Sequence, residues 1–316
     1  MRRALVRSRL LGSVAEQVGQ TPLLRLEHIG KSAPSVEIYA KLEFANPGGS
    51  VKDRPALRMM LDAVADGRLT SGKTLIDSTS GNTGVAYALF GAALGYSVEL
   101  MMPSNVTKAR KDIIQAFGAK ITYSDPMEGS DGAIRLAHKM VEENADHYFY
   151  PNQYANPSNP RAHYLGTGRE ILDALGDRIT HFVTGLGTTG TMMGTSRRLK
   201  EHTRPIRCIA AQPADALHGL EGLKHLPSSI IPQIYDDAVP DETMWIGTKD
   251  GWNMSDRLAK EEGLHVGHSS GANVFAALKI AEKLHKEQGG GCVVTIICDR
   301  GDRYFAPMKW EKRYTW

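Results

Sequence analysis

Only three cysteines occur in the 316 residues of this chain, Cys208, Cys292 and Cys298, and no two of them have a CxxC spacing. Disulfide-stabilised domains and cysteine zinc sites need more cysteines at closer spacings, so neither is expected. A chain of this length can bury a core without such cross-links, and it has room for one large or two medium domains. We therefore expect a protein of a reducing compartment that has no metal site.

The chain also lacks an excess of charge and a long apolar run. Its 38 basic and 35 acidic residues leave a net charge of +3, which is too small to indicate a nucleic-acid or membrane-surface partner. The longest apolar stretch, residues 86–102, is interrupted by Gly91 and Gly95 and is typical of a helix followed by a strand. We expect neither nucleic acid nor a membrane as a partner.

Acidic residues are missing from the start of the chain, where MRRALVRSRLLGSVAEQ has several arginines and no acid before Glu16. The stretch has no apolar segment of the kind that directs secretion. It is either a short organellar targeting peptide or a basic first helix or tail. We expect a cytoplasmic protein, with the short targeting peptide left open.

Apolar, β-rich runs alternate with helical patterns along the rest of the chain. The predicted strands are residues 36–44, 73–80, 96–103, 119–125, 147–154, 179–185, 206–212 and 292–299. The predicted helices are residues 54–67, 82–95, 108–118, 131–144, 168–176, 190–202 and 271–287. Continuous apolar strands in this order indicate parallel sheets with helices on both faces, so the predicted fold class is α/β.

Two stretches contain several prolines and little helical pattern. Residues 156–163 (NPSNPRAH) predict a boundary between two α/β units. The smaller domain is predicted to be residues 46–159, and the larger one residues 1–45 together with 160–316. The second stretch, from Gln212 to about Glu242, is predicted to be an irregular excursion that acts as a lid or an interface.

Three turns that lead into predicted helices are rich in glycine, serine, threonine and asparagine. They are residues 78–84 (STSGNTG), 185–191 (GLGTTGT) and 268–273 (HSSGAN). In open parallel sheets, ligands bind at the carboxyl ends of the strands, and a helix that begins there offers free N–H groups to an anion. Three such turns predict a ligand with more than one anionic group.

The second turn also contains the glycine spacing of a dinucleotide fingerprint, at Gly185, Gly187 and Gly190. A nicotinamide site expects an acid about 20 residues later, at the end of the next strand, where this chain has Gln212. No lysine follows the glycines, which argues against a nucleotide P-loop. The alternative of an NAD-dependent dehydrogenase therefore has weak support, and the turn suits a single phosphomonoester better.

A lone lysine, Lys52, stands behind two glycines and a serine in the run GGSVKDR, where the apolar strand 36–44 has just ended. A lysine in a loop is ordinarily a solvated charge. One at the end of a buried strand, with glycines clearing space around it, is a candidate nucleophile. A lysine nucleophile, a phosphomonoester site and an asparagine-bearing carboxylate loop together describe pyridoxal phosphate.

Several motifs carry a resemblance to a known family: NPGGSVKDR, TSGNTG, QYANPSNP, GTTGTMMG, HSSGA and CDRGDRY, in this order along the chain. The chain resembles the fold-type II pyridoxal-phosphate enzymes, and among them the B-type cysteine synthases (O-acetylserine sulfhydrylases). The resemblance extends from Val18 to Tyr304, which is nearly the whole chain. The runs GTTGT and CDRGDRY indicate the B type.

The resemblance implies two open parallel-sheet domains of the tryptophan synthase β-like architecture, a homodimer and a β-replacement reaction. O-acetyl-L-serine, or a related activated serine, would take up sulfide or thiosulfate and give L-cysteine or S-sulfocysteine. A cystathionine β-synthase or another β-replacement enzyme of the same fold is the alternative. The length of the chain argues against the animal type of that enzyme, with its haem-binding extension.

The resemblance also implies roles for individual residues. Lys52 matches the lysine that forms the Schiff base with the cofactor and then acts as the base at the substrate Cα. Asn82 matches the asparagine that bonds the cofactor's 3′-oxygen, and Ser269 matches the serine that faces the pyridine nitrogen. The residues that match the phosphate cup are Gly187, Thr188, Thr189, Gly190 and Thr191. Those that match the substrate carboxylate loop are Thr79, Ser80, Gly81, Thr83 and Gln153.

The hydroxyl of Ser269 has a mechanistic consequence. A carboxylate in its place would keep the ring nitrogen protonated and strengthen the electron sink, whereas a neutral hydroxyl does not. A weaker sink disfavours transamination and favours direct β-elimination. This residue therefore indicates β-replacement by its own chemistry.

Two regions depart from the usual pattern of the family. Residues 219–227 (GLEGLKHLP) border the substrate mouth in the family, and Lys224 there either attracts an anionic substrate or is simply solvated. The final run, FAPMKWEKRYTW, is predicted to pack across a partner subunit. Cys298, at the end of an apolar strand, is predicted to be a packed small residue rather than a nucleophile.

Overall fold

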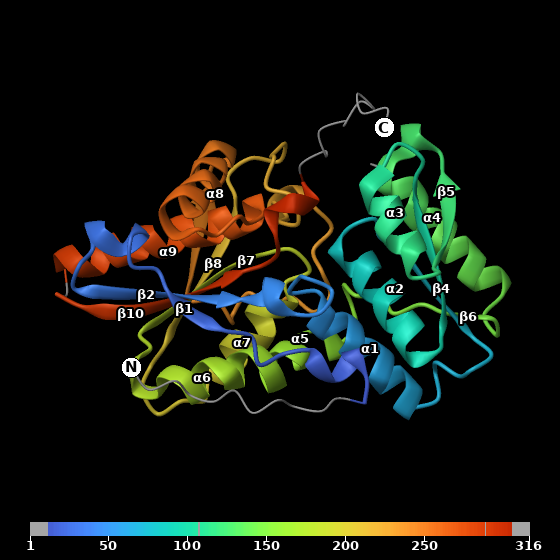
Figure 1. The fold of residues 1–316 in the computed structure, drawn as a ribbon, viewed down its shortest axis with the longest axis horizontal. Helices are drawn as coiled ribbons and strands as arrows, with labels where there is room; N and C mark the ends of the chain where they lie inside the picture. Colours follow the sequence, from blue (N-terminus) through green and yellow to red (C-terminus); the bar gives the residue numbers. More distant parts are fainter. Residues whose placement is uncertain (1–11, 107, 288, 305–316) are drawn as a thin grey trace, which may run out of the picture.

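The protein contains a six-stranded and a four-stranded β-sheet that lie side by side (Figure 1). The computed structural model describes residues 12–304 apart from residues 107 and 288. The six-stranded sheet consists, in spatial order, of β1 (Leu23–Arg25), β2 (Val36–Leu42), β10 (Gly291–Ile297), β7 (His181–Gly185), β8 (Arg207–Pro213) and β9 (Glu242–Ile246). The four-stranded sheet consists of β5 (Lys120–Ser124), β4 (Ser97–Pro103), β3 (Thr74–Ser78) and β6 (Tyr148–Phe149).

Helices cover both faces of each sheet (Figure 1). Those beside the four-stranded sheet are α1 (Asp53–Ala65), α2 (Asn82–Leu94), α3 (Lys108–Ala116) and α4 (Gly129–Glu143). Those beside the six-stranded sheet are α6 (Arg169–Leu175), α7 (Gly190–Lys200), α8 (Thr248–Glu262) and α9 (His268–Glu287). The short helix α5 (Ser158–Ala162) packs against both α1 and α7.

The cores follow from the alternation of side chains along each strand, since successive residues point to opposite faces of a sheet. In the four-stranded sheet, Leu75 packs with α1 and α2, while its neighbour Ile76 packs with α4. In the six-stranded sheet, Phe182 packs with α6 and α7, and its neighbour Val183 packs with α8 and α9. Both faces of both sheets are thus apolar, which is why the strands are continuous apolar runs.

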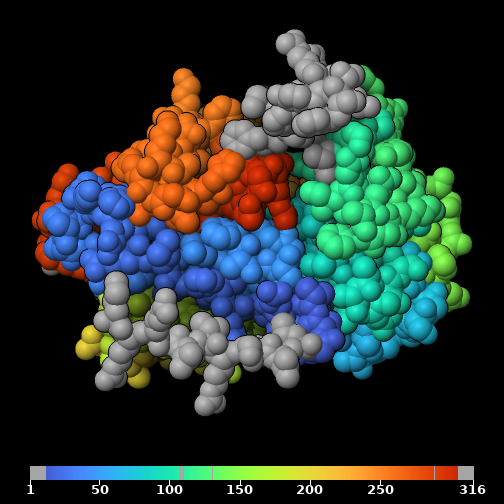
Figure 2. All heavy atoms as spheres, in the orientation of Figure 1, coloured from blue at the N-terminus to red at the C-terminus, as the bar shows by residue number. Residues whose placement is uncertain are grey.

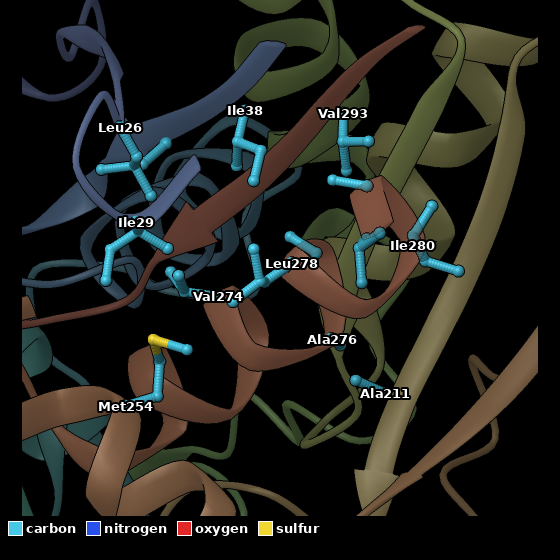
Figure 3. Close-up of a cluster of buried hydrophobic side chains, with 14 of the residues drawn as sticks. Leu26, Ile29, Ile38, Ala211, Met254, Val274, Ala276, Leu278, Ile280 and Val293 are labelled. Atoms are coloured by element: carbon cyan, nitrogen blue, oxygen red, sulfur yellow. The ribbon is translucent and has the colours of Figure 1, made fainter. Parts of the chain in front are cut away.

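Figure 3 shows the core on the α9 face of the six-stranded sheet. Val274 and Leu278 of α9 lie near Ile38 of β2 in this cluster, and Met254 of α8 closes it from the other side. These side chains are at most 4% exposed. The packing holds the start of α9 at the carboxyl ends of β2 and β10.

The predicted parallel α/β fold is confirmed, with one antiparallel exception. Strands β2, β10, β7, β8 and β9 are parallel, as are all four strands of the smaller sheet. Strand β1 pairs antiparallel with β2 at the edge of the sheet. Strand β1 was not predicted from the sequence, because three residues are too few to show a period.

Strand β9 and helix α8 were also missed. Strand β9 is an edge strand whose residues are mostly half-exposed, so it has no continuous apolar run. Helix α8 buries only a narrow stripe, formed by Gly251, Met254, Ser255 and Leu258. A stripe with a glycine and a serine among its four members gives a weak helical signal.

The prediction that residues 156–163 contain little helix was wrong. Helix α5 covers Ser158–Ala162, and a π-helical turn at His163–Gly168 joins it to α6. Pro160 is tolerated because it lies in the first turn of α5, where backbone N–H groups have no intrahelical partner. The predicted strand 147–154 is also shorter than expected, since only Tyr148–Phe149 pairs with β3.

Residues 212–242 form the irregular excursion that was predicted, and their only regular helical element is a 3₁₀ turn at Leu226–Ser228. None of the helices in the described part of the chain is long and apolar enough to span a membrane. Most of the possible targeting peptide and the final run 305–316 lie outside the described residues.

Candidate active site

Two adjoining cavities lie at the carboxyl ends of the strands, between the two sheets. The inner cavity is lined by Lys52, Asn82, Gly187, Thr188, Thr189, Thr191, Ser269, Cys298, Asp299 and Tyr304, among others. The outer cavity, which we call the mouth, has a volume of about 880 Å³. Its lining includes Lys52, Thr79, Ser80, Gly81, Asn82, Thr83, Gln153 and Lys224. The fold therefore brings all three predicted turns and the lone lysine together.

Lys52 lies between the two cavities and lines both. Its backbone N–H donates to Ser50 Oγ at 3.2 Å, and the preceding Val51 N–H donates to the Cys298 carbonyl oxygen at 2.8 Å. Burial lowers the pKa of the Lys52 amine, although the neighbouring Cys298 and Asp299 oppose that shift. A neutral amine is the form that acts as a nucleophile or a base.

The structure explains why two glycines, Gly48 and Gly49, come before Lys52. A Cβ at Gly48 would lie 2.5 Å from Asp53 Oδ1, and one at Gly49 would lie 2.7 Å from the Arg303 guanidinium. Gly49 also has a positive φ of 77°, which favours glycine. The glycines thus make room for the side chains that hold the lysine loop.

Arg54, two residues after Lys52, fastens the start of α1 to the larger sheet. Its guanidinium bonds the buried Glu43 at 2.6 Å and Glu170 at 2.7 Å. Glu170 also pairs with the buried Lys41 at 2.7 Å. This network fixes the direction in which the chain leaves Lys52. It was not predicted from the sequence, because Glu170, which joins Lys41 to Arg54, lies 116 residues from Arg54.

The turn 185–191 forms a cup at the start of α7. Thr189 has a left-handed backbone with φ 71°, and the helix begins at Gly190. A Cβ at Gly187 would lie 2.3 Å from the Gly222 carbonyl oxygen, and one at Gly190 would lie 1.9 Å from Asn159 Oδ1. The buried Thr189 hydroxyl has no hydrogen-bond partner within the described part of the chain. Free N–H groups and an unpaired hydroxyl at a helix start suit a phosphate.

Asn82 is held by the segment that follows β10. Its Nδ2 donates to Asp299 Oδ2 at 2.6 Å, and its Oδ1 accepts a hydrogen bond from Arg303. Tyr304 OH donates to the same Asp299 oxygen. Burial raises the pKa of Asp299, and the hydrogen bonds from Tyr304 and Asn82 oppose the rise. These three partners were seen only as part of the CDRGDRY motif, with no role attached to them.

Ser269 and Cys298 face the inner cavity from α9 and from the end of β10. Ser269 is buried, and the neighbouring Ser270 Oγ accepts the Cys298 backbone N–H at 2.9 Å. Burial raises the pKa of the Cys298 thiol to about 11. The thiol is therefore protonated at neutral pH, which is unfavourable for a nucleophile.

Asn159 links the two sides of the site. Its Nδ2 donates to the Gln153 carbonyl oxygen at 2.8 Å and to Thr188 Oγ1 at 3.1 Å. Its Oδ1 is buried without a partner among the described residues. Asn159 belongs to the NPSNP run, and no role was predicted for it from the sequence.

Lys224 and an ion pair lie at the mouth. The Lys224 Nζ is 5.0 Å from the centre of the Tyr154 ring, and its backbone N–H donates to the Leu186 carbonyl oxygen at 2.7 Å. Arg110 of α3 pairs with Glu221 of the excursion, so this contact joins the two sides across the opening. Both cations and Glu221 line the mouth.

The dinucleotide alternative finds little support in the geometry. Gln212, at the end of β8, is buried, and its Oε1 accepts the Leu226 N–H at 3.1 Å. It is thus used to hold the excursion. In the described part of the chain, no group of three His, Cys, Asp or Glu side chains is arranged to hold a metal ion.

The residues of the two cavities fit pyridoxal phosphate. The unpaired hydroxyl and free N–H groups of the cup suit its phosphate, and the Lys52 amine suits its aldehyde. Asn82 and Ser269 line the same inner cavity and offer an amide and a hydroxyl to a polar ring.

Comparison with known proteins agrees with this fit. The family model described as pyridoxal-phosphate dependent enzyme matches residues 14–299. A cysteine synthase of Aquifex aeolicus is 49% identical over 294 residues, which are 92% of this chain and 90% of that protein. Cysteine synthase B of Escherichia coli is 39% identical over 296 residues, which are 94% of this chain and 95% of that protein.

A solved structure supports the same grouping. The crystal structure of a cysteine synthase from Entamoeba histolytica superimposes with a TM-score of 0.92 at 36% sequence identity, covering 97% of this chain and 93% of that one. The predicted fold type and the resemblance to cysteine synthases are confirmed. The chain belongs to the family of pyridoxal-phosphate dependent enzymes, within its cysteine synthase group.

Proposed function

We propose that this protein is a cysteine synthase that replaces the acetoxy group on Cβ of O-acetyl-L-serine with sulfide or thiosulfate, giving L-cysteine or S-sulfocysteine and acetate. The observation that carries the proposal is the position of Lys52. Its partly buried amine, with a lowered pKa, lies between the cup of residues 187–191 and the carboxylate loop of residues 79–83. The cysteine synthases among its relatives support the substrate class.

The cofactor, when bound, supplies an electron sink for the bond that breaks at the substrate Cα. In our proposal the cup residues Gly187, Thr188, Thr189, Gly190 and Thr191 hold its phosphate, Lys52 holds it covalently, and Asn82 and Ser269 orient its ring. Ser269 is neutral, so it does not strengthen the sink further. The threonine, serine and asparagine side chains that line the two cavities support these assignments.

The remaining steps belong to the substrate loop and to Lys52. Thr79, Ser80, Gly81 and Gln153 bind the substrate carboxylate and so place the Cα–H bond against the amine. Thr83 supports them, because its hydroxyl donates to Gln153 Oε1 at 3.2 Å. Lys52 Nζ takes the Cα proton while acetate leaves Cβ. The sulfur donor then forms its bond to Cβ, and Lys52 Nζ returns the proton to Cα.

The size and charge of the mouth support a second substrate larger than sulfide. The mouth has a volume of about 880 Å³, and basic side chains are in excess in its lining: Lys52, Arg110, Lys224, Arg300 and Arg303 against Asp131, Glu221 and Asp302. We propose that Lys224 attracts an anionic donor such as thiosulfate, or an anionic leaving group such as phosphate. The alternative is that Lys224 only packs on the Tyr154 ring.

The function is tested by titrating the purified holoenzyme with O-acetyl-L-serine and then with each nucleophile. We expect the visible absorbance to change on the first addition and to return on the second, with cysteine or S-sulfocysteine identified by mass spectrometry. Release of cystathionine from homocysteine, without reaction of sulfide, would favour the cystathionine β-synthase alternative. If the absorbance changes with O-phospho-L-serine and not with O-acetyl-L-serine, the substrate is the phosphorylated serine.

We also propose the domain division 46–159 and 1–45 with 160–316, supported by the four-stranded sheet, whose strands all come from residues 74–149. A homodimer is proposed on the resemblance to the family. A cytoplasmic location is proposed because all three cysteines are free.

A further inference from the structure

A buried carboxylate lies behind the carboxylate loop, and the proposed reaction does not use it. Asp77 is the fourth residue of β3, just before residues 79–83, and it is only 2% exposed. Its Oδ1 accepts the Ser78 N–H at 2.7 Å. Its Oδ2 accepts a hydrogen bond from Gln153 Nε2 at 3.4 Å. Asp77 does not line either cavity, so it can act on a ligand only through its neighbours.

Gln153 is the neighbour through which it would act. The Gln153 side chain lines the mouth, and its Oε1 accepts a hydrogen bond from Thr83 Oγ1 at 3.2 Å. A primary amide has one oxygen and two N–H groups. With the oxygen on Thr83 and one N–H on Asp77, the orientation of the amide is determined and one N–H is left for a ligand.

We propose that Asp77 is a positioning residue, which keeps Gln153 presenting an N–H rather than its oxygen to the carboxylate of the amino-acid substrate. This inference rests on the proposed role of Gln153 in binding that carboxylate. A carboxylate accepts hydrogen bonds and repels a carbonyl oxygen, so a flipped amide loses one favourable contact and adds an unfavourable one.

The protonation state of Asp77 decides whether it can do this. An ionised carboxylate only accepts hydrogen bonds, whereas a protonated one can donate to the amide oxygen and favour the flipped form. Burial raises the pKa of Asp77 to about 7, against hydrogen bonds from Ser78, Tyr87 and Gln153. The titratable groups that face it are Tyr87 of α2 with Tyr150 and Tyr154, and burial raises the pKa of each phenol, so all three stay neutral.

The positioning role therefore weakens as the pH falls through about 7. We expect the KM of the holoenzyme for O-acetyl-L-serine to rise below that pH, with little change in kcat. The Asp77→Asn variant imitates the protonated side chain, since its amide can donate to the oxygen of Gln153. Its KM should be raised on the order of tenfold to a hundredfold at pH 8, the loss of one hydrogen bond to a charged group, and should not rise further at low pH.

Glu99 offers a matched control. It lies on the neighbouring strand β4, is 4% exposed, and bonds Thr122 and Tyr148 rather than any residue of the carboxylate loop. Glu99→Gln removes a buried carboxylate from the same sheet, so it reproduces any general loss of stability. We expect its KM to stay within about twofold of the wild type, because the Glu99 partners Thr122, Tyr148 and Lys120 do not include Gln153 or a residue of the loop 79–83.

The experiment combines KM, kcat and cofactor content for the wild type, Asp77→Asn, Asp77→Glu and Glu99→Gln with a binding measurement. Calorimetric titration of each holoenzyme with the unreactive amino acid L-alanine should show the same loss of affinity in Asp77→Asn and a partial recovery in Asp77→Glu. In a Gln153→Ala background, Asp77→Asn should change neither quantity further.

Two results would overturn the inference. One is an equal KM for Asp77→Asn and Glu99→Gln, and the other is an unchanged effect of Asp77→Asn when Gln153 is absent. If Asp77→Asn does not fold, the pH dependence of KM in the wild type and in Gln153→Ala decides, because the proposal requires the second to lose it. An inactive wild type that still binds L-alanine would contradict the proposed reaction but not the role of Asp77. The calorimetric titrations would then still test that role.

Discussion

The two sides of the active site are built from different kinds of groups. On the side of the six-stranded sheet, the cup of residues 187–191 presents the backbone N–H groups of a helix start together with threonine hydroxyls, and the close approach of its glycines to Gly222 and Asn159 fixes its shape. On the side of the four-stranded sheet, the loop 79–83 and Gln153 present side-chain hydroxyls and amides. Backbone at a helix start cannot move without the helix, whereas side chains adapt. The first side suits a group that stays bound, and the second suits a substrate that comes and goes.

The connection between the two sides is also informative. Each of the four apolar clusters lies on a face of one sheet, while polar contacts cross the seam between the sheets. Figure 2 shows the C-terminal residues of the described chain, in red, lying between the orange part and the green part of the molecule. There Arg303 bonds both the Gly48 carbonyl oxygen and Asn82, and Arg110 pairs with Glu221. Polar pairs exchange partners easily, so the seam suits a mouth that opens.

The largest loss of turnover is expected for Lys52→Ala, because Lys52 lines both cavities and is proposed both to hold the cofactor and to act as the base. Removal of the base alone should slow turnover by about 10²–10⁴-fold, and the covalent link to the cofactor should be lost. The side chain lines cavities and not the core, so the fold should persist in circular dichroism. An alanine variant that still carries cofactor after denaturation would contradict the assignment.

The next largest effect is expected on the side of the four-stranded sheet, where variants should lose turnover and keep the cofactor. Asn82→Ala or Ser80→Ala should leave the cofactor bound and lower turnover about tenfold to a hundredfold, the value of one hydrogen bond to a charged group. The measurement is cofactor content by absorbance beside the steady-state rate with O-acetyl-L-serine.

The cup should behave in the opposite way. Thr188→Ala or Thr191→Ala should weaken cofactor retention, since a hydroxyl bonded to a charged phosphate is worth about 1.5–3 kcal/mol. Turnover at saturating cofactor should change little. Equal cofactor loss in the cup variants and in the loop variants would show that the division of roles is wrong.

The smallest effect is expected at the mouth. Lys224→Ala should slow the reaction with thiosulfate, a dianion, several-fold at low salt and change the reaction with sulfide, at most a monoanion near neutral pH, much less. The effect should shrink at high salt, because salt screens charges over about 8–10 Å at physiological strength. Lys249→Ala, an exposed lysine that does not line the mouth, is the control. Equal rates for both variants with every anion, at low and high salt, would leave Lys224 as a residue that only packs on Tyr154.

The elements most directly determined by the sequence were the buried strands and the helices that follow them. Helix α2 was predicted as residues 82–95 and runs from Asn82 to Leu94, since its apolar residues and flanking glycines are local signals. The three turns, Lys52 and the cysteine synthase resemblance were likewise visible in short motifs. Edge strands β1 and β9 and the polar helix α8 were not, because their stability comes from neighbours that lie far away in the chain.

Only the tertiary structure decided how the motifs act on one another. Asp77 is an ordinary strand residue in the sequence, and it becomes a partner of Gln153 because β3 and the segment after β6 meet. The same holds for Asp299 and Arg303, which are 217 and 221 residues from Asn82 and still bond its amide. A motif records which chemical groups a loop carries. Their orientation and their protonation depend on burial and on partners from distant strands, and these exist only once the chain has folded.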